Sequence, residues 1–234
     1  MSSAHQYDIM IATATFLTKG IGMLTVWFIR HGESEGNVGR ATSESAMIRL
    51  TARGIEQAER IALAFIEPPT LIVTSPYLRA KQTVQPTLLR FSDVRHEEWP
   101  VHEFPFLSSL RYHNTTIEDR RPWAVAFWER CDPFYVDGEG AESFASLLHR
   151  IQQALDRLQQ SKEQFVAVFS HEEFIRAVAW SLLIGSVDNC FESMKQFRNF
   201  RKLFSIPNGA IWKVQFQAGG EIHFSNFQTS HLSV

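Results

Sequence analysis

Three short apolar runs dominate the hydrophobic pattern of the chain, and polar or charged residues follow each of them directly. The runs cover residues 24–29, 70–74 and 165–169. They are rich in β-branched and aromatic residues, which favour strands, and their nearly continuous hydrophobicity is typical of strands buried on both faces of a parallel sheet. The pattern therefore predicts three buried strands, each of which delivers polar side chains to a loop.

Segments with helical periodicity alternate with these strands. Thr51 is placed to cap a helix in which Ile55, Ala58, Ala62 and Phe65 share one face. Two adjacent prolines stop this helix before the second strand begins, because proline cannot continue a helical hydrogen-bond pattern. We therefore expect the helix to pack its apolar face on the sheet.

A second helix follows the strand at 70–74 at once. Ser75 would cap it, with Pro76 at its first position. The other predicted elements are helices over 115–134, 142–162 and 173–183, an edge strand within 91–99, and a hairpin with strands over 211–216 and 222–227. Strands that alternate with helices predict an α/β fold of three layers, helix, sheet and helix, around a mainly parallel mixed sheet.

The chain of 234 residues fits one large domain or two small ones, and we find no linker that would divide it. We expect a single domain over residues 23–234, with a cap inserted around residues 100–140. Residues 1–22 are a poor secretory signal, because Asp8 precedes their apolar patch and no basic residue occurs before Lys19. We expect them to be a dispensable extension that is disordered or results from a misassigned start.

Composition and charge exclude several classes of protein. The 23 lysines and arginines nearly balance the 25 acidic residues, and a formal charge of −2 gives no basic field for nucleic acid or a membrane surface. No segment approaches the roughly 20 apolar residues that span a bilayer. Cys131 and Cys190 match neither a metal-ligand spacing nor a disulfide framework. We therefore expect a cytoplasmic protein with no metal or other cofactor and no nucleic-acid or membrane partner; its oligomeric state stays open.

The reactive side chains lie where the three strands end. Arg30 and His31 end the first strand, Arg79 lies in the helix after the second, and His171 follows the third. The carboxyl ends of parallel strands face one crevice, so these side chains are expected to surround a single ligand. Arginine offers a planar fork of donors for phosphate oxygens, and a neutral imidazole can attack phosphorus to form a phosphohistidine.

Four motifs in this order resemble the histidine phosphatase superfamily, and its phosphoglycerate mutase-like branch fits best. The motifs are Arg30-His31-Gly32-Glu33-Ser34 with Asn37, Leu50-Thr51 with Gly54, Gln57 and Ala58, Ser75-Pro76-Tyr77-Leu78-Arg79-Ala80, and Ser170-His171. The resemblance runs from about residue 23 to Asn208-Gly209-Ala210, which is nearly the whole chain beyond the predicted extension.

The resemblance implies roles for particular residues. His31 would attack phosphorus and become phosphorylated. Asn37 matches a position that helps to bind phosphate, and Ser34 would either bind phosphate as well or cap its loop. The side chains that would surround the phosphoryl oxygens are Arg30, Arg79 and His171.

Two carboxylates are candidates for the acid that protonates the leaving group. Glu103 lies where this branch usually places its acid, and the aromatic residues beside it would desolvate it and raise its pKa. Glu172 directly follows His171, where this branch commonly has glycine and the other branch of the superfamily carries its acid. Glu172 would otherwise cap the next helix or support the site from behind. We favour Glu103 as the acid.

These roles indicate a phosphatase that hydrolyses phosphomonoesters through phosphohistidine on His31, acting on a phosphorylated small molecule or a phosphoprotein. The alternatives are phosphoglycerate mutase-type phosphoryl transfer and a non-catalytic phosphate-binding scaffold. Against the mutase, the segment after Asn37 lacks the Gly-Trp signature of cofactor-dependent mutases, and their Arg-His-Tyr-Gly does not follow Glu103. In the predicted cap, Arg120 and Arg121 would hold a substrate anion or lie on a solvated face.

Overall fold

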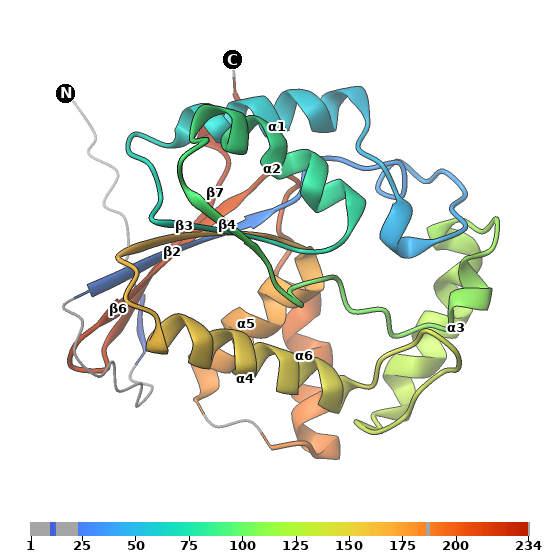
Figure 1. The fold of residues 1–234 in the computed structure, drawn as a ribbon. Coiled ribbons are helices and arrows are strands. Elements are labelled where there is room, and N and C mark those ends of the chain that lie inside the picture. Colours follow the sequence, from blue (N-terminus) through green and yellow to red (C-terminus); the bar gives the residue numbers. More distant parts are fainter. Residues whose placement is uncertain (1–9, 13–22, 186–187, 234) are drawn as a thin grey trace, which may run out of the picture.

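A seven-stranded sheet lies between two layers of helices in the computed structural model, which describes residues 10–12, 23–185 and 188–233 (Figure 1). The strand order is β1-β7-β6-β2-β5-β3-β4. Four neighbouring strands are parallel, namely β2 (Met23–Arg30), β5 (Phe165–Ser170), β3 (Leu71–Thr74) and β4 (Arg95–Glu98). Beyond β2, the sheet continues antiparallel through β6 (Ile211–Gln217), β7 (Ile222–Gln228) and β1 (Met10–Ala12). The predicted α/β fold with a mixed sheet is confirmed.

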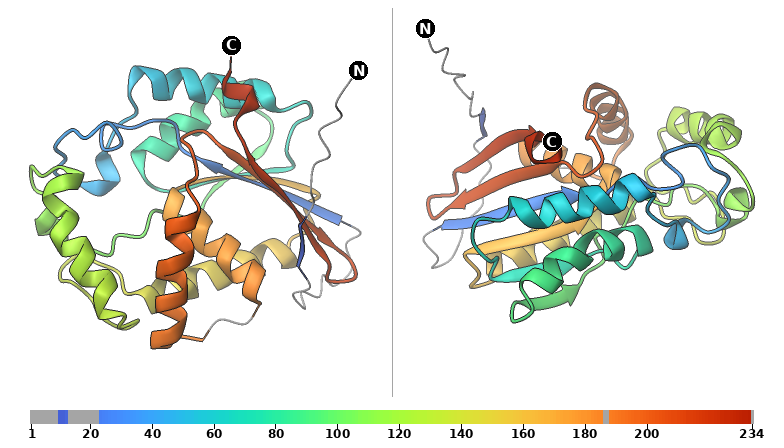
Figure 2. Two further views of the ribbon diagram at one scale, coloured as in Figure 1. Left: turned by 180° about the vertical axis from the view of Figure 1, so that it is seen from behind. Right: turned by 90° about the horizontal axis from the view of Figure 1, so that it is seen from above.

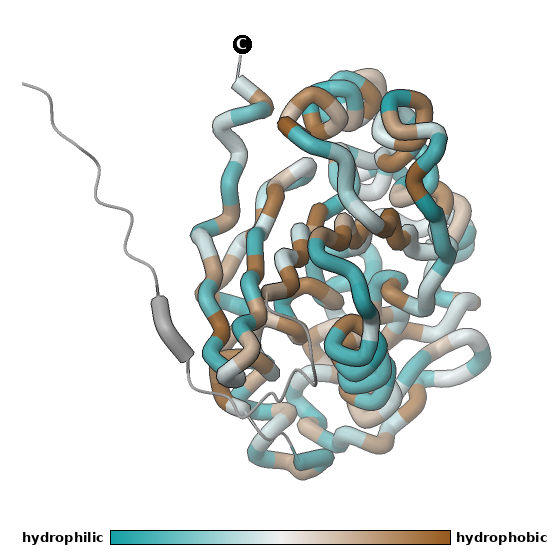
Figure 3. The backbone as a smooth tube through the Cα atoms, turned by 60° about the vertical axis from the view of Figure 1, so that its left-hand side comes forward, coloured by the Kyte–Doolittle hydropathy of each residue, from teal (hydrophilic) through white to brown (hydrophobic). Residues whose placement is uncertain are grey.

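Helices cover both faces of this sheet, and the two views of Figure 2 agree on the layering. On one face lie α1 (Ala52–Ala64) and α2 (Leu78–Arg90); on the other lie α4 (Phe144–Gln160), α5 (Glu172–Ile184) and α6 (Phe191–Leu203). Each face has its own hydrophobic cluster, which its helices share with the strands. Hydrophobic residues accordingly concentrate along the strands in the middle of the molecule (Figure 3). The apolar strand runs are therefore buried on both faces, as expected for central parallel strands.

The segment predicted as a cap lies beyond the carboxyl ends of the parallel strands (Figure 1). It contains a 3₁₀ turn, Ser109–Tyr112, and helix α3 (Ile117–Arg130). A further 3₁₀ turn, Ser45–Met47, lies in the loop between β2 and α1, and another, Ser230–Leu232, follows β7. Among the described residues, no helix has the length and hydrophobicity that a bilayer span requires.

Most predicted elements are confirmed, with local corrections. Thr51 caps α1 by accepting a hydrogen bond from the Gly54 amide at 3.1 Å. Ile55 does not share the buried face, since it is half exposed. The prediction that Ser75 caps the second helix is wrong, because α2 begins only at Leu78 and the Ser75 hydroxyl is used in the loop before it.

Two elements were not predicted from the sequence. Helix α6, whose N-cap is Cys190, buries Met194 and Phe197 against the core. Strand β1 falls inside the predicted 1–22 extension and pairs with β7, with Ile11 opposite His223. The rest of that extension lies outside the described residues.

The loop after β2 packs backbone to backbone against the start of α1. A β-carbon on Gly54 would lie 2.0 Å from the Glu33 carbonyl oxygen, and one on Gly32 would lie 2.4 Å from the Gly54 carbonyl oxygen. Such distances leave no room for any side chain. The two glycines therefore allow α1 to hold the loop that carries His31.

We expect Gly54→Ala to lower the free energy of unfolding by about 3 kcal/mol, because backbone atoms cannot yield to the added methyl group. Gly219→Ala is the matched control: a β-carbon there meets no atom within 4 Å, and stability should change by less than about 0.5 kcal/mol. Urea unfolding of both variants measures the difference. Equal stability of the two variants would contradict the close packing.

Candidate active site

Four of the predicted site residues come together at the carboxyl ends of β2, β3 and β5. Arg30 is the last residue of β2, and His31 follows it. Arg79 lies in the first turn of α2, and His171 is the N-cap of α5. The two imidazole centroids are 5.1 Å apart, and the Nε of Arg79 lies 3.1 Å from the Nε2 of His31. All four side chains are buried, so they form one compact cationic site.

The His31 imidazole is held in one tautomer. Its Nδ1 lies 2.6 Å from the carbonyl oxygen of Gly32, so Nδ1 carries the proton and donates it. Its Nε2 accepts a hydrogen bond from Arg79 and is therefore unprotonated. Burial, and then the charges of Arg79 and Arg30, hold the pKa of His31 well below its ordinary value of 6.5. The ring is neutral near pH 7, with its lone pair on the nitrogen that faces the arginine.

His171 is oriented by Ser75, a residue that the sequence suggested only as a helix cap. The Ser75 hydroxyl lies 2.7 Å from the His171 Nε2, and its oxygen accepts a hydrogen bond from the Tyr77 amide at 3.2 Å. The Nδ1 of His171 is buried and has no hydrogen-bond partner among the described residues. Burial is the first cause that holds the pKa of His171 well below its ordinary value, followed by the charge of Arg79. This imidazole is also neutral near pH 7.

Each of the two arginines is anchored to the backbone through its Nη1. Arg79 donates from Nη1 to the carbonyl oxygen of Ser45 at 2.7 Å. Arg30 uses Nη1 to contact the carbonyl oxygen of Ile206 and, at 3.0 Å, the Oε2 of Glu172. The Nε of Arg30 is buried without a partner among the described residues. Each guanidinium is thus fixed while keeping donors on its other side.

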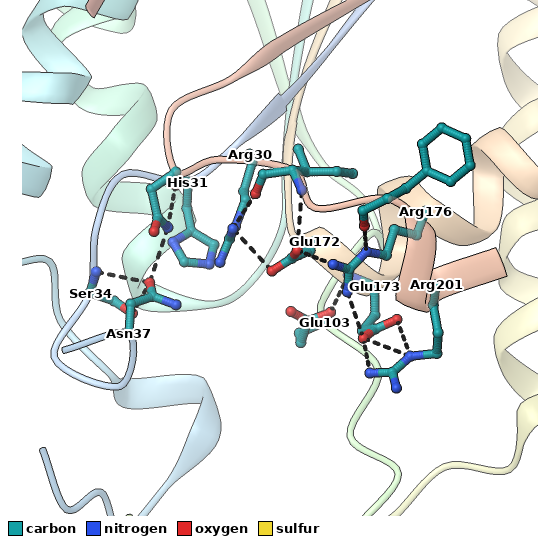
Figure 4. Close-up of polar contacts among 12 residues, drawn as sticks. Arg30, His31, Ser34, Asn37, Glu103, Glu172, Glu173, Arg176 and Arg201 are labelled. Carbon is teal, nitrogen blue, oxygen red and sulfur yellow. Dashed lines mark hydrogen bonds and ion pairs between the residues drawn. The ribbon is translucent and has the colours of Figure 1, made fainter. Parts of the chain in front are cut away.

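Ser34 and Asn37, the two residues predicted to help bind phosphate, are hydrogen-bonded to each other (Figure 4). The Oδ1 of Asn37 accepts hydrogen bonds from the Ser34 amide at 3.0 Å and from its hydroxyl at 2.8 Å. It also accepts one from the Nδ2 of Asn208 at 3.0 Å, and Asn208 in turn donates to the His31 carbonyl oxygen at 3.2 Å. Ser34 therefore closes its loop. Asn208 is a further residue of the site to which sequence reasoning gave no role.

The two predicted acids have different surroundings. Glu103 is partly buried, and its Oε1 accepts hydrogen bonds from the amides of Glu173 at 3.0 Å and Phe104 at 3.1 Å. Burial raises the pKa of Glu103 above its ordinary value, and the negative charge of Glu173 adds to this, while Arg79 opposes it. Glu172 is instead ion-paired with Arg30 and Arg176. The surroundings of Glu103 therefore favour its protonated form.

The loop after β2 and the segment around α3 meet over the site. Thr42 and Thr115 form an antiparallel bridge, with the Thr42 amide 2.9 Å from the Thr115 carbonyl oxygen. Arg120 is buried there and donates to the carbonyl oxygen of Thr115 at 2.6 Å, whereas Arg121 is exposed and pairs with Glu118. Of the two cap arginines, only Arg121 lies on a solvated face.

Among the described residues, no group of three or more histidine, cysteine, aspartate or glutamate side chains is arranged to hold a metal ion. The donors around His31 are two guanidinium groups and a second imidazole. Such donors fit the oxygens of a phosphoryl group.

Comparison with known protein families identifies the class of protein. The family model of the histidine phosphatase superfamily (branch 1) matches residues 26–221, and the chain belongs to this superfamily. This confirms the resemblance found in the motifs. The chain is an enzyme of the phosphatase type.

Characterised relatives and solved structures agree with this assignment. Adenosylcobalamin/alpha-ribazole phosphatase of Escherichia coli (strain K12) is 27% identical over 207 residues, which cover 84% of this chain and 87% of that protein. The alpha-ribazole phosphatase structure from Shigella flexneri superposes with a TM-score of 0.67 at 22% identity, covering 89% of this chain and 97% of that chain. A phosphoserine phosphatase from Entamoeba histolytica, in complex with 3-phosphoglyceric acid, has a TM-score of 0.65 at 24% identity, covering 90% and 100%. These structures share the fold.

Proposed function

We propose that the protein hydrolyses small phosphomonoesters through a covalent phosphohistidine on His31. The carrying observation is the tautomer of His31: its Nδ1 proton is tied to the Gly32 carbonyl oxygen, and its Nε2 lone pair faces the guanidinium of Arg79. A buried imidazole with a lowered pKa supplies the neutral nucleophile that attack on phosphorus requires. Arg79 would turn its Nε from this lone pair to a phosphoryl oxygen as substrate enters.

In the first step, Nε2 of His31 bonds to phosphorus while the ester P–O bond breaks and its electron pair leaves with the alkoxide. Arg30, Arg79 and His171 would neutralise the charge on the phosphoryl oxygens, with the Nδ1 of His171 as one donor. Phosphoryl transfer asks mainly for such positioning and charge. In the second step, water attacks phosphorus, the N–P bond breaks, and inorganic phosphate leaves.

Glu103 would serve both steps. As the carboxylic acid it donates its proton to the departing alkoxide, and as the carboxylate it takes a proton from the attacking water. Its raised pKa supports this role, because more of the carboxyl group stays protonated at a given pH. Glu172 is the weaker candidate, because its two oxygens are engaged by Arg30 and Arg176. We assign Glu172 a supporting position.

The pH dependence of kcat on an alkyl phosphate follows from these two pKa shifts. The pKa of His31 is lowered, so His31 stays unprotonated as the pH falls below 6.5 and activity persists there. The pKa of Glu103 is raised, so its acid form persists above pH 4.5 and kcat falls as the pH rises through that raised pKa. Measuring kcat from pH 4 to 9 tests both the acid side and the alkaline side of this pH profile. If kcat instead fell on the acid side with the ordinary histidine pKa of 6.5, the assignment of His31 as a neutral nucleophile would be contradicted.

The contacts between the loop after β2, the cap and the site bear on the size of the substrate. The Ser45 carbonyl binds Arg79, and the Thr42–Thr115 bridge joins the loop to the cap. This enclosure favours a small molecule over a phosphoprotein. The Tyr77 ring packs edge-on against His171, with centroids 5.2 Å apart, and offers an apolar wall beside the phosphoryl position. We propose that residues of the 100–140 cap select the leaving group.

A screen for phosphate release tests the proposal. Alpha-ribazole 5'-phosphate and phosphoserine come first, since the named relatives act on compounds of this kind, followed by 3-phosphoglycerate and a generic aryl phosphate. We expect hydrolysis of the aryl phosphate and of at least one metabolite, together with an acid-labile, base-stable phosphoenzyme in rapidly quenched samples. Transfer between the hydroxyls of phosphoglycerate would favour the mutase instead. Phosphate binding without any turnover would favour the scaffold.

We also propose a cytoplasmic location. Both cysteines are free: Cys131 is buried and Cys190 is exposed. Free thiols persist in a reducing compartment. Cell fractionation with activity as the readout checks the location, and recovery of the activity outside the cytoplasm would contradict it.

A further inference from the structure

Glu172 begins a chain of alternating charges that runs from the candidate site to α6 (Figure 4). It contacts Arg30 on one side and Arg176 on the other, and Arg176 and Arg201 both pair with Glu173. Glu172 directly follows His171, so this chain of ion pairs begins beside the candidate site. The mechanism above uses none of its carboxylates.

The ion pair with Glu172 holds the guanidinium of Arg30 on the side of its Nη1 nitrogen. Glu172 Oε2 lies 3.0 Å from Nη1, and the Ile206 carbonyl oxygen contacts the same nitrogen. Nη1 lies on the Cδ side of the guanidinium, whereas Nε and Nη2 point together in the other direction as a two-pronged donor. Nε is buried with no partner among the described residues. A planar fork held in this way can meet two phosphoryl oxygens at once.

Glu172 is itself held by several groups. Its Oε1 accepts from the Ile206 amide at 3.3 Å and contacts Arg176. Arg176 is fixed in turn by the Phe204 carbonyl oxygen at 2.6 Å and by Glu173 at 3.0 Å. The carboxylate therefore has little freedom to turn away from Arg30.

Charge balance gives Glu172 a second effect. Arg30 is buried near Arg79 and two imidazoles, and burial disfavours an uncompensated cation. The Glu172 carboxylate is the nearest compensating charge. Without it, the site would carry one more net positive charge and would bind a phosphate dianion more tightly.

We propose that Glu172 is a positioning residue of the phosphatase reaction: it aims the Nε and Nη2 fork of Arg30 at the phosphoryl group and limits the affinity of the site for product phosphate. This inference rests on the proposed function. Glu172 itself touches no reacting atom in it.

The test compares Glu172→Gln and Glu172→Ala with Glu163→Gln. The Glu163 side chain is 17% exposed, against 18% for Glu172, and pairs with Arg95 at the opposite end of β5. Glu163→Gln thus removes a similar ion pair far from the site. Kcat with an aryl phosphate and the inhibition constant of inorganic phosphate are measured for wild type and all three variants, with circular dichroism and thermal unfolding to check folding.

We expect both Glu172 variants to lower kcat on the order of 10- to 100-fold, alanine more than glutamine, because a displaced guanidinium no longer meets the transition state. Glu172→Gln should also bind inorganic phosphate severalfold more tightly, whereas Glu163→Gln should change neither quantity. A kcat for both Glu172 variants equal to that of Glu163→Gln, or an unchanged phosphate inhibition constant in Glu172→Gln, overturns the proposal. A wild-type protein that does not hydrolyse the aryl phosphate overturns the proposed function instead, and phosphate affinity measured by calorimetry still tests the charge effect of Glu172.

Discussion

His31→Ala should lower kcat on an aryl phosphate on the order of 10⁴-fold or more, because it removes the proposed nucleophile. The loss is expected to be this large because no other side chain in the described part of the site is placed to replace the His31 imidazole. The second imidazole, on His171, is already engaged by Ser75 through Nε2. Initial rates of nitrophenol release measure kcat, and rapid acid or base quench detects the phosphoenzyme.

A matched histidine provides the control for this loss. His223 lies on β7 near the β6–β7 turn, at the end of the sheet opposite the carboxyl end of β2, because β6 runs antiparallel to β2. His223→Ala should leave kcat unchanged. Substantial turnover by His31→Ala, or an acid-labile phosphoenzyme in that variant, would show that the nucleophile is elsewhere.

Glu103→Gln should lower kcat on an alkyl phosphate by about 10² to 10⁴, because an alkoxide cannot leave without a proton. The loss in the first step should be much smaller for nitrophenyl phosphate, whose leaving group is stable as an anion. Its second step still lacks a base, so we expect a burst of nitrophenol followed by slow turnover, with phosphoenzyme accumulating. Stopped-flow absorbance and quench experiments measure both phases.

The same two substrates separate the two candidate acids. Glu172→Gln should slow both substrates to a similar degree, because Arg30 serves every phosphoryl group alike. A burst with accumulating phosphoenzyme in Glu172→Gln, and not in Glu103→Gln, would move the acid role to Glu172. Equal losses on both substrates in Glu103→Gln would remove that role from Glu103.

The strands and most helices could be predicted because each has a local signal. The buried strands are continuous apolar runs, and Thr51 provides a helix cap that the structure confirms. Helix α6 lacks such a signal, since only Met194 and Phe197 are buried in it and most of its other side chains are polar or partly exposed. Its place in the fold depends on tertiary packing against α5, which periodicity within the segment does not reveal.

Some residues of the site could be predicted from local signals in the sequence, whereas others depend on tertiary contacts. Arg30, His31, Arg79 and His171 follow strands or begin helices, so chain order and the rule for parallel sheets bring them together. Asn208 precedes β6, and its contact with the His31 loop depends on β6 pairing antiparallel beside β2, a strand order that the hairpin signature leaves open. The roles of the charged residues behind Arg30 depend on side-chain contacts across three helices or loops, which no spacing encodes. Arg201 lies in α6, which was not predicted, and it pairs with the buried carboxylate of Glu173.

The supports of Arg30 and His31 come from the far end of the chain. The Ile206 carbonyl oxygen contacts Arg30 across 176 positions, and Asn208 reaches the His31 carbonyl oxygen across 177. Because synthesis runs from the N-terminus, the motif at residues 30–34 leaves the ribosome long before these two supports do. A nascent chain therefore contains His31 well before it contains the residues that hold the His31 loop in place.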